Sequence, residues 1–200
     1  MTLLVATTNP GKLREIEAIL ADMPIRLLTL RDLPAVEEPE ETGTTFAENA
    51  RLKARYYAQA TGLLTAADDS GLEIDALDNT PGVHSARWHG TDYAFKFEKI
   101  HELLRERGLA TSHARFVCSV ALAQQAAIVF EAEGIVSGEI AAEPRGGNGF
   151  GYDPLFFYRP FNCTLAELDQ ERKSSVSHRG KAFRALRDYL HAIRTPQSLP

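Results

Sequence analysis

The stretch Leu63-Leu64-Thr65-Ala66-Ala67-Asp68-Asp69-Ser70-Gly71 sets the expected fold. Its first part is mainly apolar or small, which predicts a buried strand, and its last two residues favour a turn. Because α/β proteins usually place ligands at the carboxyl ends of strands, we expect Asp68 and Asp69 to lie at a strand tip and to meet a ligand. An ordinary Asx-type turn is the alternative explanation for these acids.

Upstream of this stretch, strand and helix signals alternate. Thr2 to Thr7 is expected to form a buried strand, and helical spacing of apolar residues follows it. A second short strand is expected near Ile25 to Leu28. Thr45, with Glu48 three residues later, predicts a capping box for a helix that reaches about Thr61.

Downstream, the same alternation continues. Phe97 and Leu104 share one side of an expected helix, and the alternating residues between His113 and Ile140 predict a strand hairpin. A glycine-dense loop over 146–151 then precedes Lys173, the segment Ser177-His178-Arg179 and a closing helix. The pattern is typical of an α/β fold, and we expect a single domain over residues 1–200.

The composition limits the class of protein. With 44% hydrophobic and 24% charged residues, the chain is able to bury a full core in one domain or two close lobes. Cys118 and Cys163 lie far apart without metal-ligand spacing, so a reducing cytoplasm fits best. We expect neither a membrane span nor a signal peptide, and a net charge of −5 argues against broad binding to nucleic acid.

Two lysines are candidates for binding phosphate. Lys12 ends the turn Thr7-Thr8-Asn9-Pro10-Gly11-Lys12, whose free amides at a helix start favour an anion. The turn is not a Walker A loop, and a polar surface turn is the alternative. Lys53 interrupts an apolar helical stripe, so its ammonium either extends to water or faces an anion, and the residues favour neither explanation.

Acidic residues provide a candidate magnesium site. Asp68 and Asp69, with Glu40 or Glu41, offer carboxylates close to the expected phosphate site. Mg²⁺ prefers oxygen ligands and is usually held by one or two carboxylates plus substrate phosphates. A solvated acidic loop is the alternative for residues 37–41.

Aromatic residues in the last third of the chain are candidates for stacking on a base. Gly149-Phe150-Gly151-Tyr152-Asp153 places two rings between glycines, where a flat ligand can approach the backbone. Core packing of the rings is the alternative. Ser177-His178-Arg179 and Lys173 add donors, but a Ser-His-Asp hydrolase lacks support because the chain has no Gly-x-Ser-x-Gly elbow.

Taken together and in order, these segments resemble the inosine/xanthosine triphosphate pyrophosphatase family. The matching segments, within residues 7 to about 190, are Thr7-x-Asn9-x-x-Lys12, Glu41-Thr42-Gly43-x-Thr45-Phe46, Glu48-Asn49-Ala50-x-x-Lys53-Ala54, Asp68-Asp69-Ser70-Gly71, Pro81-Gly82-Val83-x-Ser85-Ala86-Arg87, Phe150-Gly151-Tyr152-Asp153-Pro154 and Ser177-His178-Arg179. The helix after Arg87 departs from the family, which often carries Asn where this chain has residues 93–99.

The resemblance implies an elongated mixed central sheet flanked by helices, two lobes with an active-site cleft between them, and a homodimer. It implies Mg²⁺-dependent hydrolysis of ITP, dITP and XTP to the monophosphate and pyrophosphate. The catalytic candidates are Asp69 as proton acceptor, its neighbour Asp68, and Lys53, and the metal ligands are Asp69 with Glu40 or Glu41. The residues implied to bind substrate are Thr7, Thr8, Asn9, Lys12, Ser70, Arg87, Phe150, Gly151, Tyr152, Asp153, Lys173, His178 and Arg179.

Three other functions remain open from the sequence. A related pyrophosphatase acting on other modified nucleotides and a phosphatase that releases orthophosphate would both differ in substrate or product. A catalytically silent nucleotide-binding module is the third. The pair Asp68-Asp69 argues against the silent module, because a pure binder gains little from negative charge beside phosphates.

Overall fold

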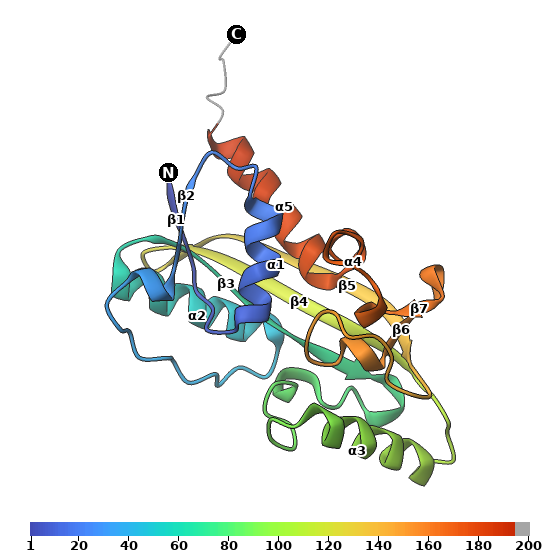
Figure 1. Ribbon diagram of the computed structural model, residues 1–200. Coiled ribbons are helices and arrows are strands. Elements are labelled where there is room, and N and C mark those ends of the chain that lie inside the picture. The colour runs from blue at the N-terminus through green and yellow to red at the C-terminus, as the bar shows by residue number, and fades with distance from the viewer. Residues whose placement is uncertain (195–200) are drawn as a thin grey trace. The chain divides into compact units, whose positions relative to one another are not determined.

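Short apolar runs form the parallel part of a mixed sheet (Figure 1). The computed structural model describes residues 1–194. In it, β1 (Thr2–Val5) pairs in parallel with β2 (Arg26–Thr29) and with β3 (Leu64–Ile74). The other strands are β4 (His113–Gln124), β5 (Ala127–Ile140), β6 (Phe156–Tyr158) and β7 (Cys163–Thr164). The seven-stranded sheet has the order β2-β1-β3-β4-β5-β6-β7, and β6 is antiparallel to both of its neighbours.

The helices confirm most of the expected α/β pattern. Their bounds are α1 (Pro10–Leu20), α2 (Phe46–Thr61), α3 (Tyr93–Glu106), α4 (Gln170–Val176) and α5 (His178–Arg194). Single 3-10 turns are found at Leu30–Asp32, Asp75–Leu77, Gly82–His84, Asp153–Leu155, Arg159–Phe161 and Leu165–Glu167. Within residues 1–194, no helix combines the length and the apolar character that crossing a membrane requires. The α/β class and the mixed sheet are thus confirmed, while the single domain stays a prediction.

Two compact units, each with its own core, divide the chain. The first contains Met1–Asp69, Ser119–Gly134 and the chain from Arg179 onward, and the second contains Ser70–Cys118 and Ile135–His178. Small side chains dominate one core of the first unit, including Ala50, Ala54, Ala58, Ala121 and Ala123. Large side chains fill the core of the second, including Leu72, Ile100, Leu104, Phe116 and Phe156. Small residues let a helix approach strands closely, which brings the polar side chains of α2 near β3.

Helix α2 begins with the capping box that the sequence predicted. Thr45 Oγ1 accepts a hydrogen bond from the Glu48 amide at 3.2 Å, and Glu48 Oε2 accepts one from the Thr45 amide at 3.1 Å. The helix ends at Gly62, whose φ of 70° is a left-handed conformation that glycine adopts without strain. These ends set the rotation of the helix, so that Asn49 and Lys53 share its buried face.

Strand β3 is longer than expected, and the prediction that it ends before the acids is wrong. It continues to Ile74, so Asp68 and Asp69 lie within the strand and Ser70-Gly71 is not a turn. Its neighbour β1 ends at Val5, opposite Ala66. The acids therefore lie just beyond the carboxyl end of β1. A strand accommodates buried carboxylates where each has cationic or hydrogen-bonding partners, as both have here.

The segment before the closing helix also differs from expectation. His178 and Arg179 lie in the first turn of α5 rather than ahead of it. A separate short helix, α4, contains Lys173 and ends at Ser177, whose extended backbone (ψ 155°) breaks the helical path. The sequence analysis expected no helix over residues 170–176, because a helix this short leaves little periodic signal.

Replacing Thr45 by Ala tests how much the capping box contributes. The change removes the acceptor for the Glu48 amide, and we expect it to lower the free energy of unfolding by about 1 kcal/mol. Urea denaturation followed by circular dichroism measures this. Thr42→Ala, an exposed threonine outside the helix, is the control and should change stability by less than about 0.5 kcal/mol. Equal effects in both variants would show that the box contributes nothing.

Candidate active site

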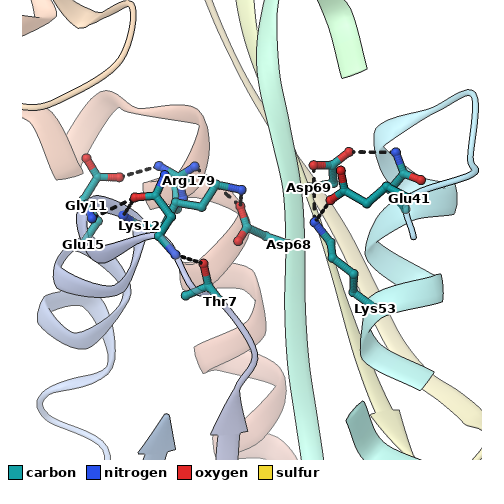
Figure 2. Close-up of polar contacts among 11 residues, drawn as sticks. Thr7, Gly11, Lys12, Glu15, Glu41, Lys53, Asp68, Asp69 and Arg179 are labelled. Atoms are coloured by element: carbon teal, nitrogen blue, oxygen red, sulfur yellow. Dashed lines mark hydrogen bonds and ion pairs between the residues drawn. The ribbon is translucent and has the colours of Figure 1, made fainter. Parts of the chain in front are cut away.

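Asp68 faces helices α1 and α5 in a buried network of charges (Figure 2). Its Oδ2 atom lies 3.0 Å from Lys12 Nζ and 3.5 Å from Arg179 Nη2. Arg179 Nη1 in turn donates to Glu15 Oε2 at 2.6 Å. The side chains of Asp68, Arg179 and Glu15 are each 5% exposed or less. Positive and negative groups thus alternate through the network.

The network keeps Asp68 ionised. Burial alone would raise the pKa of Asp68, but the positive charges of Lys12 and Arg179 outweigh burial and hold this pKa well below its usual range. A carboxylate with so low a pKa is a weak proton acceptor. The environment of Asp68 suits a structural role: as an anchor, its carboxylate holds Lys12 and Arg179 in position.

Asp69 projects to the opposite side of β3, toward helix α2 (Figure 2). Asn49 Nδ2 donates to Asp69 Oδ2 at 3.1 Å. Lys53 Nζ lies 3.4 Å from Asp69 Oδ1 and 2.6 Å from Glu41 Oε1. The ammonium of Lys53 therefore does not extend to water but lies between two carboxylates, and binding of a phosphate by Lys53 stays a prediction.

The pKa of Asp69 moves in the opposite direction from that of Asp68. Burial raises the pKa of Asp69, and the positive charges of Lys53 and Lys12 only partly offset it. Burial would lower the pKa of Lys53, but Asp69, Asp68 and Glu41 keep the proton on the ammonium and raise this pKa. Asp69 is thus a buried carboxylate with increased proton affinity, which favours it over Asp68 as a candidate general base.

Asn49 contacts the candidate site, although the sequence analysis gave it only as part of a matching motif and not as a site residue. It is fully buried. Its Oδ1 accepts a hydrogen bond from the Gly43 amide at 2.8 Å, which directs its Nδ2 toward Asp69. A Cβ atom on Gly43 would lie only 2.6 Å from that Oδ1 atom, so glycine permits the close approach. The available signal was an Asn four residues before Lys53 on one helix face.

Asp69 and Glu41 offer carboxylate oxygens, the type of ligand that a magnesium ion prefers. Lys53 Nζ contacts both carboxylates, so one cation is able to reach both. Glu40, the other candidate, is exposed. Within residues 1–194, no group of three or more His, Cys, Asp and Glu side chains is arranged to hold a metal. Two carboxylates agree with Mg²⁺ rather than zinc, because Mg²⁺ takes its remaining ligands from phosphates and water.

The turn at the start of α1 is partly closed to an anion. Asn9 Oδ1 accepts hydrogen bonds from the amides of Gly11 at 2.8 Å and Lys12 at 3.1 Å, and Thr7 Oγ1 accepts from the Asn9 amide. The expectation that these amides are free is therefore wrong, since Asn9 caps the helix itself. Thr8 is exposed, and phosphate binding by this turn stays a prediction.

The second unit brings together three of the residues predicted to enclose a base. Asp153 Oδ2 lies 2.5 Å from Lys173 Nζ and accepts a hydrogen bond from the Phe150 amide at 2.7 Å. Lys173 Nζ also lies 4.8 Å from the centre of the Phe150 ring. A Cβ atom on Gly149, whose φ is 74°, would collide with the Asp153 carboxylate. Phe150 is half-buried, and its role in stacking on a base stays a prediction.

The remaining predicted residues of this set have different surroundings. The His178 ring stacks on that of Phe116, with centres 4.7 Å apart. Tyr152 is buried, as expected from the core-packing alternative, and its hydroxyl donates to the Ser85 carbonyl at 3.0 Å. Arg179 contacts Glu15 and Asp68 in the first unit. Their roles in base binding, like those of the half-buried Ser70 and Gly151 and the exposed Arg87, stay predictions.

Comparison with known proteins gives the family of the chain. A sequence model of the Ham1 family matches residues 3–189. The chain belongs to the Ham1 family. This Ham1 chain is 53% identical over 186 residues to a dITP/XTP pyrophosphatase of Nostoc sp., covering 92% of this chain and 91% of the relative. It is 48% identical over 195 residues to a dITP/XTP pyrophosphatase of Geobacter sulfurreducens, covering 94% and 96%.

A solved structure supports the same family. A HAM1 protein from Coxiella burnetii superimposes with a TM-score of 0.88 and 41% sequence identity, covering 96% of this chain and 99% of that chain. Because the sequence identity is 41%, the likeness supports membership of the same family as well as a common fold. The family resemblance that the sequence motifs indicated is confirmed.

Neutralising Asp68 and neutralising Asp69 should have different effects on the free energy of unfolding. Asp68→Asn removes a negative charge from between Lys12 and Arg179, and we expect it to lower the free energy of unfolding by about 3 kcal/mol at neutral pH. Asp69→Asn removes a charge that burial disfavours, so stability should stay within about 1 kcal/mol or rise. Urea denaturation of both variants checks the contrast, and equal losses would contradict the assignment of one anchor and one base.

Proposed function

We propose that this chain hydrolyses deaminated purine nucleoside triphosphates, namely ITP, dITP and XTP, to the monophosphate and pyrophosphate, and so removes them from the nucleotide pool. The observation that carries the proposal is Asp69, a buried carboxylate of raised pKa between the Lys53 ammonium and the Asn49 amide. The names of the relatives from Nostoc and Geobacter support the substrate class.

In the proposed reaction, Asp69 accepts the proton of an attacking water. The water oxygen forms a bond to the α-phosphorus, the bond from that phosphorus to the α–β bridging oxygen breaks, and pyrophosphate leaves with the electron pair. Such hydrolysis depends mainly on positioning and on neutralising charge on the phosphate oxygens. Lys53 carries its positive charge next to Asp69, and Lys12 is held in place by Asp68.

Asp69 and Glu41 are the proposed ligands of Mg²⁺. When bound, Mg²⁺ supplies positive charge that stabilises phosphate oxygens and orients the substrate. Glu41 is preferred to Glu40 because its carboxylate already lies against Lys53, whereas Glu40 is exposed. A reaction limited to the protein's own cations would leave the charge of a triphosphate largely uncompensated.

Base selection is assigned to the second unit. A 6-oxo purine presents a hydrogen-bond acceptor where adenine presents an amino donor. Lys173 is a donor beside the Phe150 ring, and His178, which stacks on Phe116, is a second candidate donor in the same unit. A donor facing a donor leaves both groups unpaired, which is penalised in a buried site. The proposal also includes a homodimer and a cytoplasmic location, and light scattering of the purified protein tests the first of these.

Asp69→Asn tests the catalytic assignment. Because general-base catalysis contributes about 10²- to 10⁴-fold, kcat for XTP should fall by at least about 10²-fold, while the nucleotide still binds. Pyrophosphate release and calorimetric titration measure the two quantities. Asp188→Asn, an exposed acid on α5, is the matched control and should keep wild-type kcat. A near-normal rate for Asp69→Asn would remove Asp69 from the mechanism.

The products and the metal requirement test the reaction class. With Mg²⁺, the wild-type protein should convert XTP and dITP to monophosphate and pyrophosphate, and ATP should react about 10²-fold or more slowly. Excess EDTA should abolish turnover, and added Mg²⁺ should restore it. Chromatography of the products distinguishes the alternatives: orthophosphate with diphosphate indicates a phosphatase. Thermal stabilisation by XTP without any product indicates a silent binding module.

A further inference from the structure

Lys96 on α3 is a fully buried cation that the predicted site does not include. Its exposed fraction is 0%. Its Nζ atom donates to the carbonyl of Ala86 at 2.8 Å and to that of Ser85 at 3.2 Å. In the described part of the chain, residues 1–194, no carboxylate forms an ion pair with it, and burial lowers the pKa of Lys96. Lysine is seldom buried without an acidic partner, so this arrangement requires an explanation.

Two tyrosine rings complete the surroundings of this ammonium. Lys96 Nζ lies 4.3 Å from the centre of the Tyr93 ring and 5.6 Å from that of the Tyr152 ring, within the range of cation–π attraction. The Tyr152 hydroxyl donates at 3.0 Å to the same Ser85 carbonyl that Lys96 contacts. Lys96 and Tyr152 therefore converge on one backbone oxygen and also contact each other.

These contacts join two segments that were both predicted to bind substrate. One is the turn Ser85-Ala86-Arg87, whose arginine is exposed while its first two carbonyls are held by Lys96. The other is Phe150 to Asp153, fixed through Tyr152. We propose that Lys96 is a positioning residue that holds these two segments in the arrangement that binds the purine nucleotide. The inference rests on the proposed function and extends it to a residue outside the substrate-binding set.

A purely structural role explains this lysine poorly. An apolar side chain of similar length would fill the same space without the cost of burying a charge. Ser85 would keep the Tyr152 hydroxyl as a donor, and Ala86 is exposed, so water is able to reach that residue. Loss of the ammonium should therefore change the global stability little. It should instead loosen the two segments relative to each other, which affects binding of substrate first.

Lys96→Met tests the inference, with Lys99→Met as the matched control. Lys99 lies one turn further along α3, is partly exposed and pairs with Glu102. For Lys96→Met, we expect KM for XTP to rise about tenfold or more, kcat to change by less than about threefold, and the melting temperature to stay within about 3 °C. Lys99→Met should keep the wild-type KM. Lys96→Arg, which retains a cation, should recover part of the loss in KM.

The outcomes separate this inference from the proposed function. Absence of pyrophosphate release from XTP by the wild-type protein would contradict the proposed function itself. Wild-type turnover with an unchanged KM in folded Lys96→Met would overturn only the role of Lys96. Should Lys96→Met fail to fold, Lys96→Gln, which keeps an amide donor without the charge, replaces it. An unchanged KM in folded Lys96→Gln then overturns the inference in the same way.

Discussion

The alternating direction of successive side chains along strand β3 is the constraint on which the rest of the site depends. Successive side chains of a strand point to opposite faces, so Asp68 and Asp69 are adjacent in sequence yet lie in separate environments. One carboxylate contacts two cations, and its pKa falls; the other is dominated by burial, and its pKa rises. On a shared face, the two charges would repel each other and titrate as a coupled pair. The opposite pKa shifts of Asp68 and Asp69 therefore follow from backbone geometry.

Local signals made a large part of this arrangement predictable. The capping box of Thr45 and Glu48 determined where α2 begins, and helical spacing then placed Lys53 on its buried face. The ordered motifs indicated the family, which is confirmed. These features depend on residues within a few positions of one another, or on ordered motifs, and both can be seen in a sequence.

The features that could not be predicted depend on residues distant in sequence. Ending the strand before Asp68 was reasonable on local polarity, because the partner Arg179 lies more than a hundred positions away. The same applies to Glu15 beside Arg179 and to Lys96 beneath the carbonyls of Ser85 and Ala86, since no periodic pattern marks a contact between segments. The pair His178-Arg179 was treated as a unit, yet one side chain stacks on Phe116 while the other contacts Glu15 and Asp68.

The orientation of the Asn49 side-chain amide determines which oxygen of Asp69 it contacts. Asn49 Oδ1 accepts a hydrogen bond from the Gly43 amide and Asn49 Nδ2 donates one to Asp69 Oδ2, so hydrogen bonds run in a single direction through the side chain. Turning the amide over would set its oxygen against the carboxylate and its NH₂ group against the Gly43 N–H, two repulsive contacts at once. With Oδ2 accepting from Asn49, Oδ1 is the oxygen that faces Lys53, whose Nζ lies 3.4 Å away. The backbone amide of Gly43 thus determines which donor each of the two chemically equivalent oxygens of Asp69 meets.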